Sequence, residues 1–153
     1  MAFSSDLLTC IDNTIDVAPD FGALGMVGID SSNIIHWSNP TQIKQIVTFD
    51  GSFIMIRMDM GIRFDDINFN ELHGSVEDYC MQIGRLYGKN CYTLLISSRE
   101  ASQYGLRNIE ESFLDHYSVT AIGKGYAYFA ASRWREFRNK LEQKWPGIKT
   151  TNG

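Results

Sequence analysis

Apolar and polar residues alternate over residues 53–64 in a long period-two pattern. One side of the pattern is entirely apolar and consists of Ile54, Ile56, Met58, Met60, Ile62 and Phe64. The other side consists of Arg57, Asp59, Gly61 and Arg63. Because side chains point alternately to the two faces of a strand, this pattern predicts a long β-strand with one buried face.

Apolar residues recur at helical spacing in four other segments. The spacing predicts helices near residues 4–17, 75–87, 99–116 and 132–145. The first helix has an apolar side formed by Leu8, Ile11 and Ile15. The last helix has the sharpest stripe, which consists of Trp134, Phe137, Leu141 and Trp145. We expect Trp134, Phe137 and Leu141 to dock on the sheet.

Local signals mark where two of the helices begin and end. Ser75 is a suitable N-cap, Asp78 stands at the capping-box position, and Gly88 is a C-terminal stop. A short helix is predicted after Pro40, where Pro suits the first helical position. Its apolar face consists of Ile43, Ile46 and Val47.

Three further regions have the composition of strands. Residues 91–97 are almost continuously apolar, which predicts a central strand buried on both faces. Residues 23–29 and 34–37 flank a turn sequence, so they predict a hairpin. Residues 119–131 hold one strand, or two around a Gly-Lys-Gly turn.

The order of these elements predicts an α/β fold, and an α+β arrangement also fits. We expect one mixed sheet of five or six strands with an N-terminal hairpin, packed helices and a C-terminal amphipathic helix. The chain has 153 residues, of which 44% are hydrophobic, and this is enough for one ordinary core. We therefore predict a single domain over residues 1–147 and a frayed tail over residues 148–153.

Part of this order resembles a known family. Residues 92–98, the helix that follows and residues 126–134 are similar to elements of STAS-like (anti-sigma-factor antagonist-like) domains, and the resemblance spans residues 53–145. It implies a regulatory role in which a loop and helix after a buried strand contact a partner protein. The family's phosphorylatable serine directly precedes a glycine. Here Gln103 and Tyr104 precede Gly105, and this departure weakens the case for a phospho-switch.

The first third of the chain carries a competing resemblance. A helix, a hairpin over residues 28–37 and a short helix resemble the opening of profilin-like and roadblock-like domains. A final amphipathic helix suits those domains as well. Both resemblances imply a regulatory or interaction module.

Charge is distributed unevenly along the chain. The net charge is −4, yet residues 133–149 hold six Lys or Arg and only two Glu. An acidic body with one basic helix lacks the broad basic face of nucleic-acid-binding proteins, so we expect no nucleic-acid partner. The basic helix is compatible with an acidic protein partner.

The sequence also indicates a compartment. No apolar run approaches the roughly 20 residues needed to span a bilayer, and residues 1–6 lack the features of a signal peptide. We therefore expect a cytoplasmic protein with no membrane span. In a reducing compartment the three cysteines, which form no zinc pattern, are expected to be small core residues: Cys10, Cys80 and Cys91.

The histidines and clustered carboxylates predict no metal site and no cofactor. The histidines are far apart in sequence: His36, His73 and His116. Four carboxylates lie close together but lack the spacing of a calcium loop, so they predict a solvated turn: Asp59, Asp65, Asp66 and Glu71.

Two sets of residues are candidates for a binding site. Ser97, Ser98 and Arg99 follow a buried strand and open a helix, where α/β folds place their sites and where anions are favoured. Plain helix capping explains them too, and no nucleophile motif surrounds either serine. The second set is on the basic last helix, where we expect a partner to contact Arg135, Arg138 and Trp145. Lys144 belongs to the same outer face and is expected to stay solvated with the two arginines.

These observations predict a non-enzymatic cytoplasmic regulatory or protein-interaction module with no catalytic residues. The partner is expected to be a protein, with an acidic surface or a second copy of the chain as options. One alternative is a sensor of a small or hydrophobic ligand, with a pocket lined by Met55, Met58, Tyr92 and Phe113. Another is an uncharacterised enzyme with a polar site at residues 97–99.

Overall fold

The computed structural model describes residues 6–49, 54–69, 74–96 and 135–151. The helices in this part of the chain are α1 (Asp6–Val17), α2 (Ser75–Tyr87), a helix over residues 135–144 and the short 3-10 helix η1 (Met58–Met60). The strands are β1 (Phe21–Gly25), β2 (Val27–Ile29), β3 (Ile35–Trp37), β4 (Gln45–Ile46), β5 (Thr48–Phe49), β6 (Ile54–Ile56) and β7 (Asn90–Thr93). The helix predicted near 99–116 and the strands predicted within 119–131 lie outside the described residues.

The strands form two small sheets. The first has the order β4-β7-β1-β6, in which β1 runs parallel to β7 and antiparallel to β6. The second has the order β3-β2-β5 and is antiparallel. The predicted combination of helices with a mixed sheet is confirmed, although the strands are divided between two sheets.

The division occurs where one predicted strand becomes two. The segment predicted as a strand over residues 23–29 leaves the first sheet after Gly25 and joins the second sheet as β2. A Cβ atom at Gly25 would lie 2.5 Å from the ring of Phe49, and one at Gly28 would overlap the side chain of Ile46. Both glycines therefore let core side chains from residues 45–49 pack directly on the backbone.

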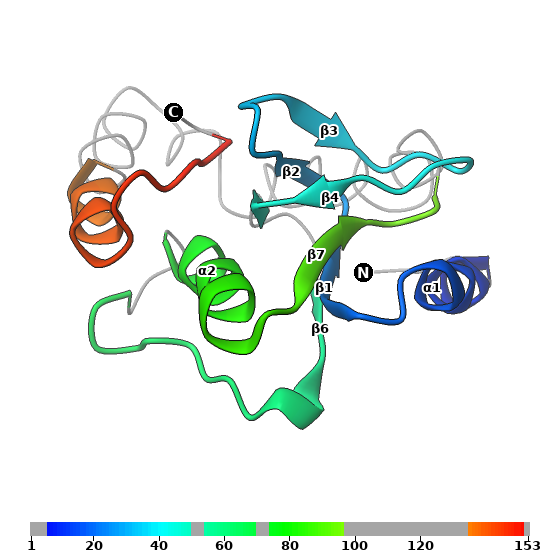
Figure 1. Cartoon of the computed structure of the whole chain (residues 1–153), viewed down its shortest axis with the longest axis horizontal. Coiled ribbons are helices and arrows are strands. Elements are labelled where there is room, and N and C mark those ends of the chain that lie inside the picture. The colour runs from blue at the N-terminus through cyan, green and yellow to red at the C-terminus, as the bar shows by residue number, and fades with distance from the viewer. Residues whose placement is uncertain (1–5, 50–53, 70–73, 97–134, 152–153) are drawn as a thin grey trace, which may run out of the picture.

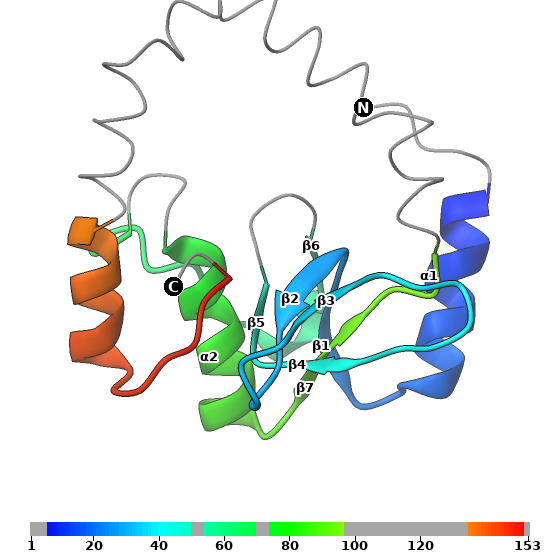
Figure 2. The ribbon, with the colours of Figure 1, turned by 90° about the horizontal axis from the view of Figure 1, so that it is seen from above.

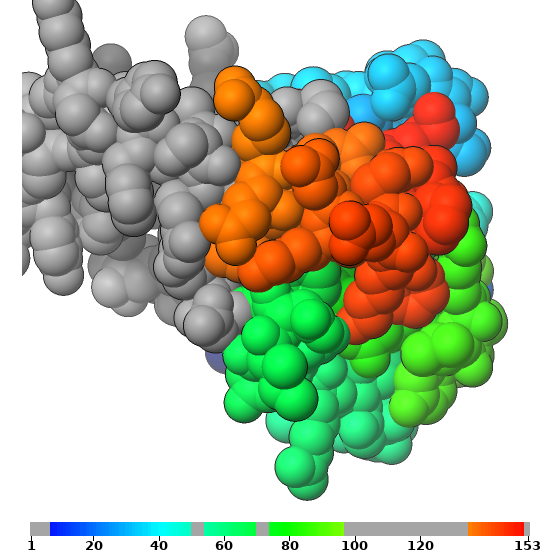
Figure 3. All heavy atoms as spheres, turned by 90° about the vertical axis from the view of Figure 1, so that its left-hand side faces the viewer, coloured from blue at the N-terminus to red at the C-terminus, as the bar shows by residue number. Residues whose placement is uncertain are grey.

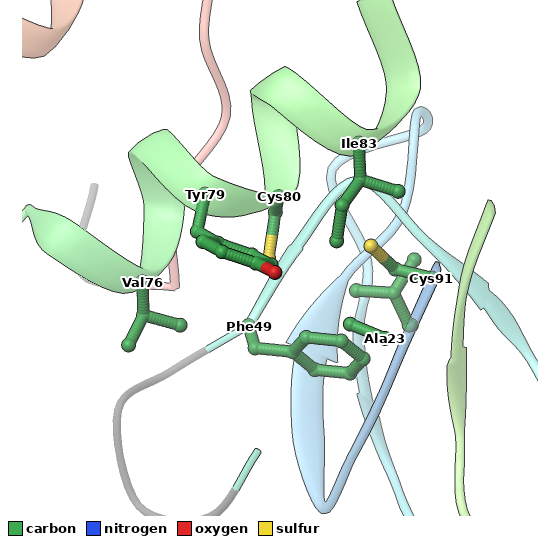
Figure 4. Close-up of a cluster of buried hydrophobic side chains, with 8 residues drawn as sticks. Ala23, Phe49, Val76, Tyr79, Cys80, Ile83 and Cys91 are labelled. Carbon is green, nitrogen blue, oxygen red and sulfur yellow. The ribbon is translucent and has the colours of Figure 1, made fainter. Parts of the chain in front are cut away.

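The first sheet is covered by one helix on each side, α1 on one and α2 on the other (Figures 1 and 2). The α1 side of the core contains Leu7, Leu24 and Leu94. The α2 side contains Ala23, Tyr79 and Ile83, as Figure 4 shows. Neighbouring residues of β1 thus point to opposite faces, as the two-residue period of a strand requires.

The position of α1 is confirmed, but its apolar side differs from the prediction. Leu8, which we expected in the core, is exposed, and Leu7 is buried instead. Ile11 and Ile15 pack against the core as expected. Polar contacts also fix this helix, because the backbone N–H of Leu95 donates to Thr14 Oγ1 over 3.0 Å.

Helix α2 has the predicted bounds, with a left-handed glycine at each end. Gly74 (φ 86°) precedes it and Gly88 (φ 60°) ends it. Cys80 and Cys91 are buried free thiols in the core that this helix covers, so their prediction as core residues is confirmed, while Cys10 is only partly buried. Burial, and then the neighbouring Cys91, raises the pKa of the Cys80 thiol.

Three predictions about local elements are wrong. The segment predicted as a strand over residues 53–64 is described as a strand only at β6, and it continues as η1 and a left-handed Gly61. Its partner β1 is short, and the N–H of Arg57, which donates to the carbonyl oxygen of Gly22, makes the last backbone hydrogen bond described between the two. The predicted helix after Pro40 is instead β4 and β5. Pairing with β7 and β2 outweighs the helical pattern there.

The third wrong prediction concerns the length and burial of the strand at 91–97. It lies inside the first sheet as predicted, but β7 ends at Thr93, and Tyr92 is only partly buried. Its hydroxyl donates to the carboxylate of Asp20 over 3.1 Å at the rim of the sheet. This strand is therefore not covered completely on both faces.

The helix over residues 135–144 confirms the described part of the predicted C-terminal helix. Phe137 and Leu141 are fully buried and pack with Phe69 and with Met81 of α2. The helix thus packs beside α2 and not on the sheet, as Figure 1 shows, because α2 already covers that face. The contact between the rings of Phe69 and Phe137 has a centroid distance of 6.3 Å.

The segment after this helix is packed, although we predicted a frayed tail from residue 148. Ile148 and Thr150 are buried. Thr48 Oγ1 of β5 donates to the carbonyl oxygen of Lys149 over 2.5 Å, which ties the segment to the second sheet. Across the described ranges, no helix has both the length and the apolarity needed to cross a membrane.

Candidate interaction surface

The structure places the predicted site residues in different surroundings. Ser97, Ser98 and Arg99 lie outside the described residues. Arg135 is exposed, Arg138 is half-buried and Trp145 is buried. The second predicted site is therefore not one continuous exposed surface.

Trp145 belongs to the core, so its predicted role as a surface anchor is wrong. Its side chain is 9% exposed, and its Nε1 donates to Asp78 Oδ1 over 2.6 Å. Arg85 and Lys144 lie near the indole ring at 5.9 and 5.7 Å. The polar edge of this tryptophan is used inside the molecule, which leaves only a small part of it for a partner.

Asp78 is the acceptor at the centre of a buried polar network. Besides Trp145, it accepts hydrogen bonds from Gln82 Nε2 and pairs with Lys144 Nζ, each over 2.8 Å. Its predicted role in a capping box is wrong, because its carboxylate turns toward the C-terminal helix and Gly74 is the N-cap. A fully buried carboxylate with three donors is the expected solution for a charge removed from water.

Lys144 extends this network to Asp65, whose carboxylate lies 2.7 Å from the ammonium group. Burial alone would lower the pKa of Lys144, but the hydrogen bonds that its ammonium group donates to Asp65 and Asp78 outweigh burial and raise the pKa. Hydrogen bonds from Lys144 and Asn68 hold the pKa of Asp65 well below its ordinary value. Asp65 is therefore a structural ion-pair partner and not part of a solvated turn.

The basic charge of the last helix is largely paired within the molecule. Arg138 bonds to Glu142 at 3.2 Å and donates to the carbonyl oxygen of Ile148 at 3.1 Å. Lys140 pairs with Glu136 at 3.0 Å. Arg135 has no ion-pair partner among the residues that the structure describes. The surface that we predicted for an acidic partner thus carries less free positive charge than the sequence indicates.

The β2–β3 hairpin presents a different kind of surface. Asp30 shapes its turn, because Oδ1 accepts from the N–H groups of Ser32 and Ile34 over 2.8 and 2.9 Å. A 2.8 Å hydrogen bond joins Asp30 Oδ2 to His36 Nε2 of β3, and this bond lowers the pKa of Asp30. The predicted hairpin is confirmed, and His36 serves it as a cross-strand partner.

Large apolar side chains of β3 are exposed on one face of this hairpin. Ile35 is 47% exposed and Trp37 is 62% exposed. They are two residues apart on a strand, so they share a face, which we call the hairpin face. Their cross-strand neighbours are Ile29 and Val27, both buried. The hairpin face is thus an apolar surface on a strand that pairs with a buried strand.

An open groove adjoins the hairpin face. It has a volume of about 740 Å³ and lies between the hairpin and the C-terminal segment, which Figure 3 shows side by side. Its apolar wall includes Ile29, Ile35 and Ile148, and its charged wall includes Arg138, Glu142 and Lys149. The groove therefore combines an apolar side with two cations and one anion. It differs from the predicted pocket, because neither Met55, Met58 nor Tyr92 lines it.

Comparisons with protein families, curated proteins and solved structures found no match to this chain. The resemblances to STAS-like, profilin-like and roadblock-like domains therefore stay predictions. Within the described ranges, no three His, Cys, Asp or Glu side chains are grouped so that they could hold a metal ion.

Sequence reasoning missed the hairpin face. The run Ile34-Ile35-His36-Trp37 predicted a strand, but an apolar run does not reveal which strand lies at the edge of a sheet. The available signal was the shortness of the run and its place after a tight turn, because short hairpin strands often form sheet edges.

Proposed function

We propose that this protein is a non-enzymatic regulatory module that binds a protein partner through the hairpin face. The observation that carries the proposal is the exposure of Trp37 beside Ile35 on β3, an edge strand of the second sheet in the described part of the chain. Exposed tryptophans in apolar surroundings are common energetic centres of protein interfaces. The free thiols of the core suit a reducing compartment, so we place this activity in the cytoplasm.

A paired comparison of variants tests this proposal. Purified wild-type chain is immobilised beside Trp37→Ala and Ile67→Ala, and proteins retained from the native extract are quantified by mass spectrometry. Ile67 is a matched control because it is 87% exposed on another part of the surface. We expect one set of proteins to be retained by wild type and Ile67→Ala and lost with Trp37→Ala. Equal retention by all three chains would contradict the proposal.

The groove favours a second candidate function, the binding of a small ligand. Its volume of about 740 Å³ falls within the range of known ligand pockets. Arg138 and Lys149 outnumber Glu142 on its walls, which favours a ligand that has an anionic group and an apolar body. The test is the mass spectrum of small molecules released from purified wild type and from Lys149→Glu. A molecule carried by wild type alone would support the sensor. Identical spectra would contradict it.

The enzymatic alternative at residues 97–99 lies outside the described residues. It stays a prediction.

A further inference from the structure

We infer that the partner of the hairpin face is a second copy of this chain, paired antiparallel along β3. This inference rests on the proposed function and names its partner. Within the part of the chain that the structure describes, β3 has β2 on one side and no strand on the other. Figure 1 shows β3 at the rim of the drawn molecule.

The hydrogen bonds of the hairpin show which groups of β3 face outward. The N–H of Ser38 donates to Met26, and the N–H of Asp30 donates to Ile34. Hydrogen-bonded pairs in an antiparallel ladder alternate with non-bonded pairs. His36 opposite Gly28 is therefore a bonded pair, and the N–H and C=O groups of Ile35 and Trp37 point away from β2.

These outward groups are self-complementary. When two copies of β3 run antiparallel about a two-fold axis at His36, Ile35 of one copy lies opposite Trp37 of the other. Each such pair exchanges both backbone hydrogen bonds, so every outward N–H and C=O of the two residues finds a partner. An isologous contact of this kind closes after two copies.

The side chains fit the same register. Directly opposite residues in an antiparallel pair point to the same face, so Ile35 packs against Trp37 of the second copy. Pairs of an aromatic and a β-branched side chain are favourable across strands. The contact covers both residues of the hairpin face and joins the two three-stranded sheets into one.

The edge of β3 lacks three of the usual protections against such pairing, while its length of three residues limits the contact to the pairs of Ile35 with Trp37. Exposed edges are commonly blocked by lysine, by proline or by an inward-pointing charge. None of these occurs in Ile35-His36-Trp37, and His36 is held on the opposite face by Asp30. By contrast, the edge strand β6 of the first sheet runs directly into Arg57 and η1.

Sedimentation equilibrium of the full chain tests this inference. Wild type is expected to reach twice the chain mass of 17.4 kDa as its concentration rises. Ile35→Pro removes an N–H that the hairpin itself does not use, so we expect a folded chain whose dimer dissociation constant is raised more than about tenfold. Ile35→Val keeps the N–H and the branched side chain and is expected to dimerise like wild type. Wild type that stays at 17.4 kDa, or a dimer unaffected by Ile35→Pro, would overturn the inference.

Hydrogen exchange on wild type tests the register without any variant. The amides of Ile35 and Trp37 are expected to become protected only as the concentration rises, whereas the amide of His36 is protected throughout. Protection of all three at every concentration, or of His36 alone, would overturn the pairing. If wild type is monomeric but Trp37→Ala still loses the proteins that wild type retains from the extract, only the self-pairing is overturned. If wild type is monomeric and all three chains of the extract experiment retain the same proteins, the proposed function is overturned as well.

Discussion

Two tryptophans of this chain lie in opposite environments. Trp145 follows the C-terminal helix, is 9% exposed and donates its N–H to the buried Asp78. Trp37 ends a strand that lies at the edge of its sheet in the described part of the chain, and it is 62% exposed. The first tryptophan completes the fold, whereas the second is available to a partner.

The difference shows that a residue's role depends on what covers its element. The C-terminal helix was expected to present Trp145 because of its basic residues, but α2 and Phe69 receive its apolar stripe. The hairpin was expected only as a structural unit, but no described strand pairs with the outer edge of β3. Substitutions in the two regions should therefore change different properties, stability in one and association in the other.

The largest effect on stability is expected from Phe137→Ala. This side chain is fully buried between the C-terminal helix and α2, so its removal leaves a cavity. The free energy of unfolding should fall by about 3–5 kcal/mol. Chemical denaturation followed by circular dichroism measures the change. Ile67→Ala is the control and should stay within about 0.5 kcal/mol of wild type. A loss below about 1 kcal/mol with Phe137→Ala would show that the contact between the two helices is not part of the core.

A smaller loss is expected from Asp78→Asn. The amide keeps one acceptor for Trp145 but removes the charge that pairs with Lys144. Because Lys144 still has Asp65 as a partner, the expected loss is about 1.5–3 kcal/mol. The same denaturation experiment measures it, with the exposed Asp66→Asn as control. Equal stabilities of the two variants would show that the network around Trp145 contributes nothing.

Two arginines of the C-terminal helix should respond differently to truncation. Arg138 donates to the carbonyl oxygen of Ile148 and holds the packed segment, so Arg138→Ala should cost about 1 kcal/mol. Arg135 is exposed, so Arg135→Ala should leave the melting temperature nearly unchanged. Differential scanning calorimetry compares them. If Arg135→Ala is the more destabilising variant, the assignment of Arg138 as the structural arginine is wrong.

Acid should weaken the same region through Asp65. Its pKa in the folded chain is below the ordinary value of 3.8, because Lys144 and Asn68 hydrogen-bond the carboxylate. The unfolded chain therefore takes up this proton first as the pH falls. The contribution of Asp65 to the free energy of unfolding is complete above pH 3.8 and is lost as the pH falls toward the pKa of the folded chain. Chemical denaturation at pH 5 and at pH 3 measures how much the free energy of unfolding falls between the two pH values. The fall should be smaller in Asp65→Asn than in wild type. An identical loss in both chains would contradict this assignment.

A small effect on stability, like that of Arg135→Ala, is expected from Trp37→Ala. The side chain is mostly exposed, so the free energy of unfolding should change by no more than about 0.5 kcal/mol. The same variant should lose association in the extract and in sedimentation experiments. A large loss of stability would place Trp37 with Trp145 as a structural residue and remove the contrast between the two regions.

Local patterns predicted the helices better than the strands. The bounds of α2 follow from the spacing of Val76, Cys80 and Ile83 and from Gly88, all of which act within the helix. The alternation over residues 53–64 failed because a strand also requires a partner of matching length, and β1 supplies it only as far as Gly22. Pairing is a property of the folded chain and is absent from any local window.

The candidate site was less predictable than the fold. The composition of residues 133–149 indicated a basic surface, but Asp65 and Asp78 come from distant parts of the chain to pair with Lys144. The sequence pattern contains no sign of that pairing. The exposure of Trp37 likewise depends on the strand order β3-β2-β5, which places its strand at an edge.

Photo-crosslinking from position 37 tests most directly whether the hairpin face binds a protein. Benzoylphenylalanine is placed at position 37 or, as a control, at the exposed position 67, and each chain is irradiated in its native cells. The account predicts a crosslinked protein from position 37 and none from position 67, and the mass of the product tells a second copy from another partner. No product from position 37, or equal products from both positions, would contradict it.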